Sequence, residues 1–323
     1  MTTGSATADA LATRQESTST SLSEAAAMFE RHLRARGLAD KTCALYLGAI
    51  GTLSAHLVSR GMPTSLGAIT REHVEDFFAA RLAAPSVRRP GHRISRTTVN
   101  LEYRALHRFF AWAVEADELR RSPMEHTKPP KPSTVPPPVI EVPDLRALLR
   151  ACEGRTFADR RDYAMVRLFL DCGLRRNELA SLTVDTVDRA RGQVRVRGKG
   201  DKTRDVPYGF KTGEAIDRYW SKRRAHPHAA SEAFWLGDRG PLTASGVAQV
   251  IATRSERAGL GRVNPHRFRH TFAHEWLANG GQEGDLMRLT GWSSRSMLDR
   301  YGASAASKRA AEAQRKNSLG DRL

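Results

Sequence analysis

Residues 264–276 read NPHRFRHTFAHEW, and the interpretation of the whole chain turns on this stretch. Three histidines spaced four apart share one face of a helix: His266, His270 and His274. Such spacing could hold a metal ion, but Arg267 and Arg269 lie among the histidines, and cations belong beside an anion. A zinc-hydrolase helix needs H-E-x-x-H with a glutamate as general base, and Arg267 stands in the glutamate's place. The stretch therefore indicates a helix that binds an anion, with no metal.

The start of this helix is predicted by Asn264 as N-cap and Pro265 as first helical residue. His266 then lies in the first turn, where the helix dipole favours an anion. His266 and Arg269, three residues apart, lie on one face and can point at one phosphate group.

The charge of the chain favours a polyanionic partner. Its 323 residues carry a net charge of +17, with 43 arginines against 9 lysines. Arginine's planar fork grips phosphate oxygens in pairs, so nucleic acid is the first candidate; a basic solvated surface without a specific partner stays open. The chain has three isolated cysteines and no CxxC: Cys43, Cys152 and Cys172. They fit a reduced cytosolic protein with neither a disulfide framework nor a cysteine metal cage. No cofactor is expected. No apolar run approaches the ~18 residues of a membrane span, so no membrane partner is expected.

Composition divides the chain into five parts. Residues 1–20 are rich in Ser, Thr and Ala and are expected to be a disordered tail. Residues 21–122 are expected to form an all-α domain of four helices, and residues 123–142 a linker, since eight prolines lie between positions 123 and 143. Residues 143–305 are expected to form a second domain, followed by a C-terminal helix or tail at 306–323.

The four helices of the first domain are predicted from apolar periodicity. The first starts at an S-x-x-E capping box, Ser21 and Glu24, and stops at Gly37. The second ends at Gly61, the third starts near Thr70, and the fourth ends near Asp117.

Between the third and fourth helices lies PSVRRPGHRISRTTVN, residues 85–100, an arginine-rich loop that leads into a helix N-terminus. Such a loop is suited to contact a nucleic-acid backbone, although a solvated loop would look the same. The candidate DNA-binding residues are Lys41, Thr42, Arg88, Arg89, Arg93, Arg96, Arg104 and Lys202.

The second domain is predicted to be α+β and mostly helical. Helices are expected at 142–151 and 162–174 and in GLRRNELASL. Short strands follow in TVDTVD, at Gln193 to Arg197 and at Thr203 to Pro207, the last two joined by a glycine-flanked turn. Helices are expected from about Gly213 to the end.

Four segments of this domain carry a resemblance when taken together and in order: GLRRNEL (173–179), RGKGDK (197–202), HRFR (266–269) and GWSSRSMLDRYG (291–302). They resemble the tyrosine site-specific recombinases, the lambda-integrase/Xer/Cre family. The interval of nine residues from Trp292 to Tyr301 matches that family's pattern, and the resemblance covers about residues 21–310. It implies an all-α, SAM-like core-binding domain and a mostly helical catalytic domain with a small antiparallel sheet.

The resemblance also implies a role for each residue. Tyr301 would attack a DNA phosphodiester and form a 3′-phosphotyrosyl link. Arg175 and Arg269 would neutralise the non-bridging oxygens, and His266 would bond a phosphate oxygen or accept the tyrosine proton. Lys199, with Lys202 as a rival, would protonate the leaving 5′-oxygen. Trp292 would donate one hydrogen bond, Glu178 would orient Arg175 or His266, and His270 would support the site.

The family acts as a homotetramer on two double-stranded DNA sites with inverted-repeat cores, through a Holliday junction, in the cytoplasm at the nucleoid, with or without an accessory protein. The resemblance implies a simple type without an arm-binding domain, and a tail that docks on the neighbouring protomer. Xer proteins usually have His where Trp292 stands, which favours a mobile-element or phage integrase over Xer-like dimer resolution. A type IB topoisomerase, a DNA-binding regulator and a metal-dependent nuclease are the rival functions.

Overall fold

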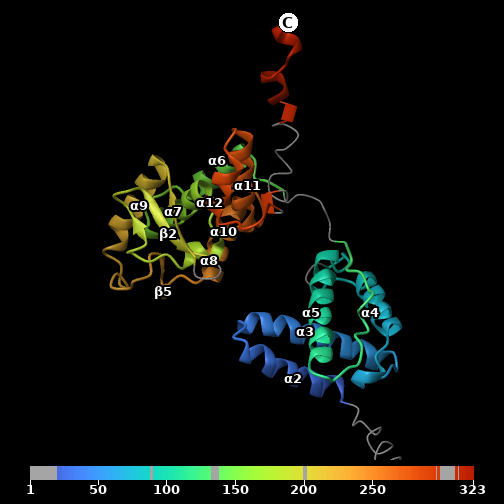
Figure 1. Cartoon of the computed structure of the whole chain (residues 1–323). Helices are drawn as coiled ribbons and strands as arrows, with labels where there is room; N and C mark the ends of the chain where they lie inside the picture. Colours follow the sequence, from blue (N-terminus) through green and yellow to red (C-terminus); the bar gives the residue numbers. More distant parts are fainter. Residues whose placement is uncertain are drawn as a thin grey trace, which may run out of the picture. The chain divides into compact units, whose positions relative to one another are not determined.

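The computed structural model describes residues 20–87, 90–131, 138–198, 202–295, 297–298, 310–311 and 313–323. The chain divides into two compact units, residues 1–134 and 135–323, shown in Figure 1. The first is all-α and the second is mostly helical with a small antiparallel sheet, so the predicted fold class is confirmed. The predicted N-terminal tail lies almost wholly outside the described residues.

The first unit is built from four long helices and a short 3-10 turn: α2 (Leu22–Ala35), α3 (Asp40–Ser59), η1 (Leu66–Ala68), α4 (Arg71–Ala83) and α5 (Arg96–Glu115). The capping box of Ser21 and Glu24 is present at the start of α2. Gly37 and Gly61 follow α2 and α3 with positive φ, which an L-residue adopts only at a cost. The four predicted helices are therefore confirmed.

The core of this unit consists of the apolar stripes of these helices. Phe29 of α2 packs in van der Waals and ring contact with Phe109 and Trp112 of α5, with centroids 5.4 and 5.1 Å apart. Leu53 and Phe77 are fully buried beside them. In Figure 1, α5 crosses α2 and α3.

Helix α3 corrects one expectation from the sequence. Among the described residues it is long and apolar enough, by length and composition alone, to cross a membrane. The sequence reading overlooked it because small residues such as Gly48 and Gly51 interrupt its larger apolar ones. Its Ile50, Leu53 and Leu57 are buried in the core that the helices of this unit share.

The segments around the expected linker are held at both ends. Met124 is fully buried in the core of the first unit, and Tyr103 and Asn100 of α5 donate hydrogen bonds of 2.8 Å to the carbonyls of Thr127 and Pro130. On the other side, Ile140 donates from its backbone N–H to Thr271 Oγ1 at 2.8 Å.

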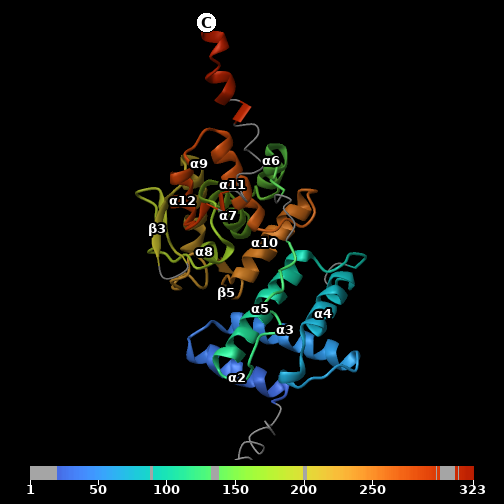
Figure 2. The same cartoon turned by 45° about the vertical axis from the view of Figure 1, so that its right-hand side comes forward.

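The helices of the second unit are α6 (Val142–Ala151), α7 (Phe157–Cys172), α8 (Arg176–Ala180), α9 (Phe210–Arg223), α10 (Ala244–Arg257), α11 (His266–Ala278), α12 (Glu283–Thr290) and the 3-10 turn η2 (Gly320–Arg322). Helix α7 begins five residues earlier than predicted, because Thr156 and Asp159 form a capping box there. It lies centrally in the unit, in contact with α6, α9, α10 and α11 (Figure 2).

The sheet of this unit has three antiparallel strands in the order β1–β2–β3: β1 (Val187–Asp188), β2 (Gln193–Arg197) and β3 (Thr203–Pro207). In the β2–β3 hairpin, Val194 lies opposite Val206 and Val196 opposite Arg204, which confirms the predicted strands. The expectation of helices only after Gly213 is wrong. A second hairpin, β4 (Leu236–Gly237) with β5 (Gly240–Pro241), intervenes, and strands of two residues are too short to show a periodicity.

A buried ion network ties α10 to α7. Arg254 donates to Asp162 Oδ2 at 2.8 Å, to Asp159 Oδ1 at 2.9 Å and to the Ala151 carbonyl at 2.9 Å. Arg161 donates to the other oxygen of Asp162, Oδ1, at 2.8 Å. Because charges buried without partners are costly, this network fixes the mutual position of the two helices.

Candidate active site

Arg175 and Glu178 form the first part of the site, at the start of α8. Glu178 accepts hydrogen bonds from the Arg175 backbone N–H at 2.8 Å and from Arg175 Nη1 at 2.7 Å. The Arg175 side chain is 39% exposed, whereas that of Glu178 is 5% exposed. Burial by itself raises the pKa of the Glu178 carboxyl group, but the hydrogen bonds and charges of Arg204 and Arg175 outweigh burial and leave the pKa lowered. Glu178 is thus a buried carboxylate that orients a partly exposed arginine.

Arg269, in α11, joins two of the segments singled out in the sequence. Its Nη1 donates to the carbonyl of Gly173 at 2.9 Å, and its Nη2 donates to the carbonyl of Thr290 at 2.6 Å. Gly173 lies two residues before Arg175, and Thr290 lies two residues before Trp292. The Arg269 side chain is 0% exposed, so its charge acts in surroundings of low dielectric, where electrostatic effects are strong.

Gly173 makes that contact possible. It ends α7 in the left-handed conformation with φ of 55°, and a Cβ atom there would lie 2.4 Å from Cδ1 of Phe272. Only glycine fits both the backbone angle and the space.

Trp292 is a buried residue whose ring faces Arg269. The guanidinium carbon of Arg269 lies 5.2 Å from the centroid of the Trp292 ring, a cation–π contact. Trp292 belongs to a small apolar cluster that includes Leu277, Leu286 and Leu298. Since Leu298 lies three residues before Tyr301 in the sequence, the tryptophan packs against the segment that leads to that tyrosine.

The N-terminus of α11 agrees with the prediction. Pro265 directly precedes His266, and its φ and ψ are already helical, as expected of a first helical residue. The Asn264 side chain caps the turn, accepting from the His266 backbone N–H at 2.9 Å. His266 is exposed and His270 is buried, with their rings perpendicular and their centroids 5.0 Å apart.

Four of the predicted residues fall on positions of the chain that the structure does not describe. Lys199 and Tyr301 lie outside the described residues, as do Arg88 and Arg89 of the candidate DNA-binding set. Lys202, the rival of Lys199, is exposed just before β3.

Arg204 belongs to the group of side chains around Glu178, and the sequence analysis did not predict it. It leaves β3 with a bidentate pair to Glu178, Nη1 to Oε1 at 3.1 Å and Nη2 to Oε2 at 2.9 Å. Its Nε donates to the carbonyl of Leu289 at 2.7 Å. The alternation of β3 could have found it, since Arg204 lies on the same face as the buried Val206.

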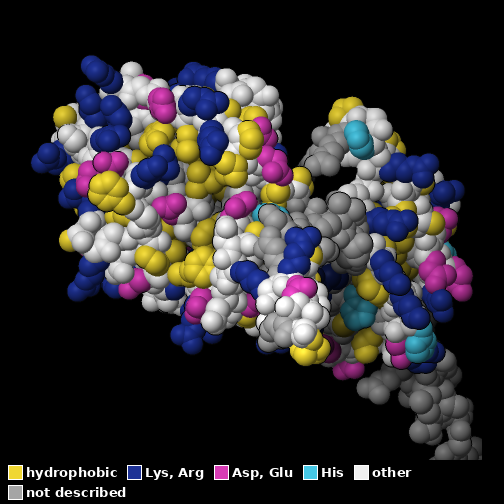
Figure 3. Space-filling view, turned by 90° about the horizontal axis from the view of Figure 1, so that it is seen from above, with side chains coloured by type: hydrophobic (Ala, Val, Ile, Leu, Met, Phe, Trp, Pro, Cys, Tyr) yellow, Lys and Arg dark blue, Asp and Glu magenta, His cyan; other side chains and the backbone are white. Residues whose placement is uncertain are grey.

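The remaining DNA-binding candidates lie on the first unit. Lys41 and Thr42 are in the first turn of α3, Arg96 and Arg104 are exposed on α5, and Arg93 is exposed in the preceding loop. The N-terminal halves of α3 and α5 and this loop, Arg93 included, line one hollow of about 870 Å³. In Figure 3, Lys and Arg side chains are spread over the visible face with Asp and Glu side chains between them.

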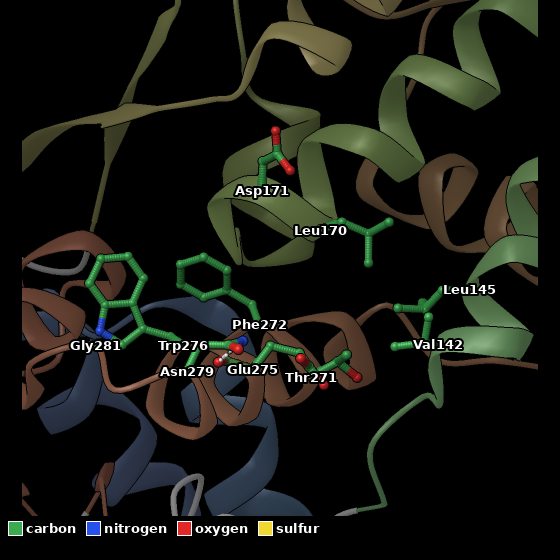
Figure 4. Close-up of a pocket in the computed structure, with 10 residues that line it drawn as sticks. All are labelled: Val142, Leu145, Leu170, Asp171, Thr271, Phe272, Glu275, Trp276, Asn279 and Gly281. Carbon is green, nitrogen blue, oxygen red and sulfur yellow. Dashed lines mark hydrogen bonds between the residues drawn. The ribbon is translucent and has the colours of Figure 1, made fainter.

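A separate apolar pocket of about 640 Å³ lies in the second unit, between α6, α7 and α11. Figure 4 shows the rings of Phe272 and Trp276 on one side and Leu170 and Leu145 on others. Two acids, Asp171 and Glu275, also line it.

No group of three His, Cys, Asp or Glu side chains that could hold a metal ion occurs within the described ranges. The chemistry that the described side chains offer is that of arginines, histidines and one carboxylate. Such a set stabilises a phosphate and transfers protons.

Comparisons with known proteins identify the family of the chain. The Phage integrase family matches residues 138–308. A tyrosine recombinase XerC from Syntrophus aciditrophicus (strain SB) is 26% identical over 285 residues, which are 85% of this chain and 91% of the relative. Another XerC, from Mycobacterium sp. (strain JLS), is 32% identical over 275 residues, 82% of this chain and 89% of the relative.

The fold is also similar to that of a solved structure, a lambda integrase dimer bound to a COC′ core site. The TM-score is 0.70 at 19% identity, over 90% of this chain and 80% of the other. By its family match, its relatives and its fold, the chain belongs to the tyrosine recombinases of the phage integrase family, enzymes that break and rejoin DNA strands.

Proposed function

We propose that the protein recombines DNA at specific paired sites, with Tyr301 as the nucleophile. The tyrosine oxygen attacks the phosphorus atom, a 3′-phosphotyrosyl bond forms, and the bond to the 5′-oxygen breaks. His266 takes the tyrosine proton or bonds a phosphate oxygen, and Lys199 supplies a proton to the leaving 5′-oxygen. Because the covalent intermediate keeps the energy of the phosphodiester, rejoining needs neither ATP nor a metal.

The observation that carries this proposal is the double contact of Arg269. Its hydrogen bonds to Gly173 and Thr290 support an arrangement in which GLRRNEL, HRFR and the tryptophan segment act on one phosphate. Arg175 is the cation of this cluster whose side chain is most open to a ligand, with Glu178 holding it from behind. Arg269 is fully buried, so a direct bond from Arg269 to the phosphate requires the residues covering it to move.

Duplex DNA with inverted-repeat core sites is the proposed partner. The first unit would contact the backbone through Lys41, Thr42, Arg93, Arg96 and Arg104, together with Arg88 and Arg89, and Lys202 would add a contact from the second unit. The net charge of +17 supports this assignment. An accessory protein would act on the choice of site. We place the enzyme in the cytoplasm, at the nucleoid.

Four copies would act on two sites through a Holliday junction, linked by their tails. The tail of one copy would dock in the apolar pocket of its neighbour. Two acids line that pocket, and the tail carries Arg315 and Lys316 followed by the exposed Leu319; this complementarity supports the pairing. Deleting residues 306–323 is expected to abolish tetramers on DNA while sparing single-site binding. Tetramers formed normally by the truncated protein would refute the tail contact.

The biological role proposed is integration or excision of a mobile element or phage, since Trp292 stands where Xer proteins usually have His. Xer-like resolution of chromosome or plasmid dimers is the second candidate, and the relatives named XerC favour it. Sequencing the target decides between them. A site at the end of a mobile element supports the first, and a single chromosomal or plasmid site in strains without such an element supports the second.

The test of the reaction uses two circular plasmids that each carry the target sequence, incubated with the protein in EDTA and without ATP. Joined circles are expected. Relaxed circles without joining would indicate a type IB topoisomerase, and products formed only after magnesium is restored would indicate a metal-dependent nuclease.

A further inference from the structure

Arg204 occupies a position that none of the roles above explains. It lies on β3 opposite Val196, and so belongs to the hairpin whose turn contains Lys199. Its side chain is 13% exposed, against 39% for Arg175. Arg204 therefore lies on the inner side of Glu178, and Arg175 on the outer side.

All three nitrogens of the Arg204 guanidinium donate to named acceptors. The two terminal nitrogens hold the two oxygens of Glu178, and Nε holds the carbonyl of Leu289, in the last turn of α12. This fork geometry is specific to arginine, because lysine has one point-like ammonium group. Gly291 leaves space for it, since a Cβ atom there would lie 3.1 Å from Arg204 Nη1.

Two arginines donate hydrogen bonds to backbone carbonyls at the C-terminal end of α12. Arg204 holds the carbonyl of Leu289, and Arg269 holds that of Thr290. Both carbonyls lie at the negative end of the helix dipole, where cations are favoured. After these two hydrogen-bonded residues, the chain continues through Gly291 and Trp292 towards Tyr301.

We propose that Arg204 is a positioning residue that links the Lys199 hairpin to two other parts of the site, Arg175 through Glu178, and the tyrosine segment through Leu289. It acts through these partners and does not contact DNA. This inference rests on the proposed function, because it assigns Arg175 and Tyr301 their roles in cleavage. It predicts that removing Arg204 disturbs the contacts of both Arg175 and the segment after α12.

The physical consequence concerns the Glu178 carboxylate. With Arg204 removed, burial would act on Glu178 with only Arg175 opposing it, and the pKa of Glu178 would rise. A protonated Glu178 no longer fixes the Arg175 guanidinium by charge. Cleavage by an Arg204 variant should therefore fall as the pH is lowered through a range in which the wild type is constant.

The experiment compares Arg204→Met and Arg204→Lys with the wild type. It measures binding and cleavage of duplex DNA that carries the target sequence, identified by sequencing the DNA that stays bound to the wild-type protein. The Arg204→Met enzyme should bind a single site normally but cleave roughly 10- to 100-fold more slowly, the effect of a small misplacement in an active site, with a loss that deepens at low pH. The lysine variant keeps the charge without the fork and should recover little of the rate.

The matched control is Arg195→Met. Arg195 lies on the neighbouring strand and also makes a bidentate pair, to Asp205, but on the exposed face of the hairpin. The Arg195→Met enzyme should cleave at the wild-type rate at every pH. If Arg204→Met and Arg195→Met give the same rates and pH profiles, Arg204 is not a positioning residue.

A double variant separates positioning from a general loss of structure. Because part of the Arg204 effect runs through Glu178, the double variant Arg204→Met with Glu178→Gln should cleave faster than the product of the two single losses predicts. Independent, multiplying losses would contradict the proposal. Absence of cleavage by the wild type itself would instead count against the proposed function. For an Arg204→Met protein that does not fold, the cleavage rate of Arg204→Lys decides, because this variant keeps the charge and loses only the fork: a rate equal to that of Arg195→Met would contradict the proposal.

Discussion

The carbonyl oxygen of Thr290 accepts a 2.6 Å hydrogen bond from Nη2 of Arg269, while Nη1 of the same guanidinium holds Gly173. Two segments more than a hundred residues apart in the chain are thereby fixed by one side chain. The relationship gives Arg269 a structural task in addition to the proposed chemical one, and the two tasks can be measured separately.

Replacing Arg269 by Lys should lower both stability and cleavage. Lysine keeps a charge but cannot reach two carbonyls in a fixed fork. The lost charged hydrogen bonds should cost on the order of 2–3 kcal/mol of unfolding free energy, measured by urea denaturation. Cleavage per folded molecule should fall further, by about 100-fold or more. Unchanged cleavage per folded molecule would leave Arg269 with the structural task alone.

Replacing Gly173 by Ala should destabilise the second unit through two effects. The left-handed backbone angle costs about 1–2 kcal/mol for a residue with a Cβ atom, and the clash with Phe272 adds about 1–3 kcal/mol. Gly37→Ala is the matched control, because its φ is +68° but no atom lies within 4 Å of the added Cβ. Equal losses of unfolding free energy from the two substitutions would argue against the close contact of Gly173 with Phe272.

The buried network of Arg254 should matter for stability and not for the reaction. Arg254→Met leaves Asp162 buried with one partner fewer, and such losses cost about 3–5 kcal/mol. Arg218→Met, which breaks an exposed pair with Glu214, should change the unfolding free energy by about 0.5 kcal/mol or less. At a temperature where both variants are folded, cleavage rates should match the wild type. A selective loss of cleavage in Arg254→Met would connect this network to the active site.

Glu178 predicts a dependence of stability on pH. Its pKa is lowered in the folded protein from the value of 4.5, so the folded state binds the proton less readily than the unfolded state. The stabilisation is complete above the unfolded pKa and is lost as the pH falls through the folded pKa. The difference in unfolding free energy between wild type and Glu178→Gln should be constant at neutral pH and shrink below about pH 4.5. A difference that grows on acidification would mean that the sign of the shift is wrong.

The arginines of α5 predict a change in the salt dependence of DNA binding. Arg96→Ala or Arg104→Ala should each reduce the slope of log affinity against log salt by about one on non-specific duplex DNA. Arg34→Ala provides the control, because Arg34 already pairs with Glu30 on α2. Identical slopes for all three variants would remove the α5 arginines from the DNA contact.

The sequence predicted the elements with strong local signals. The bounds of β2, β3 and α6 came out as expected, since alternation, the glycine-flanked turn and apolar periodicity are all local. It failed where the signal was short or the partner distant. The β4–β5 hairpin has two residues per strand, too few to show a periodicity. The alternation of β3 indicates that Arg204 faces inward, but its contact with Leu289 spans 85 positions, and no local spacing predicts that partner. For Arg269 the residue was predicted, but its two carbonyl partners could not be, because any backbone oxygen can accept.

The most direct test of the central claim is recovery of DNA that stays bound to the protein after SDS treatment of cells, with the wild type compared with Tyr301→Phe, followed by sequencing. Tyr301 as nucleophile predicts discrete sites recovered from the wild type and none from the variant. Equal recovery from both proteins would contradict the covalent role of Tyr301.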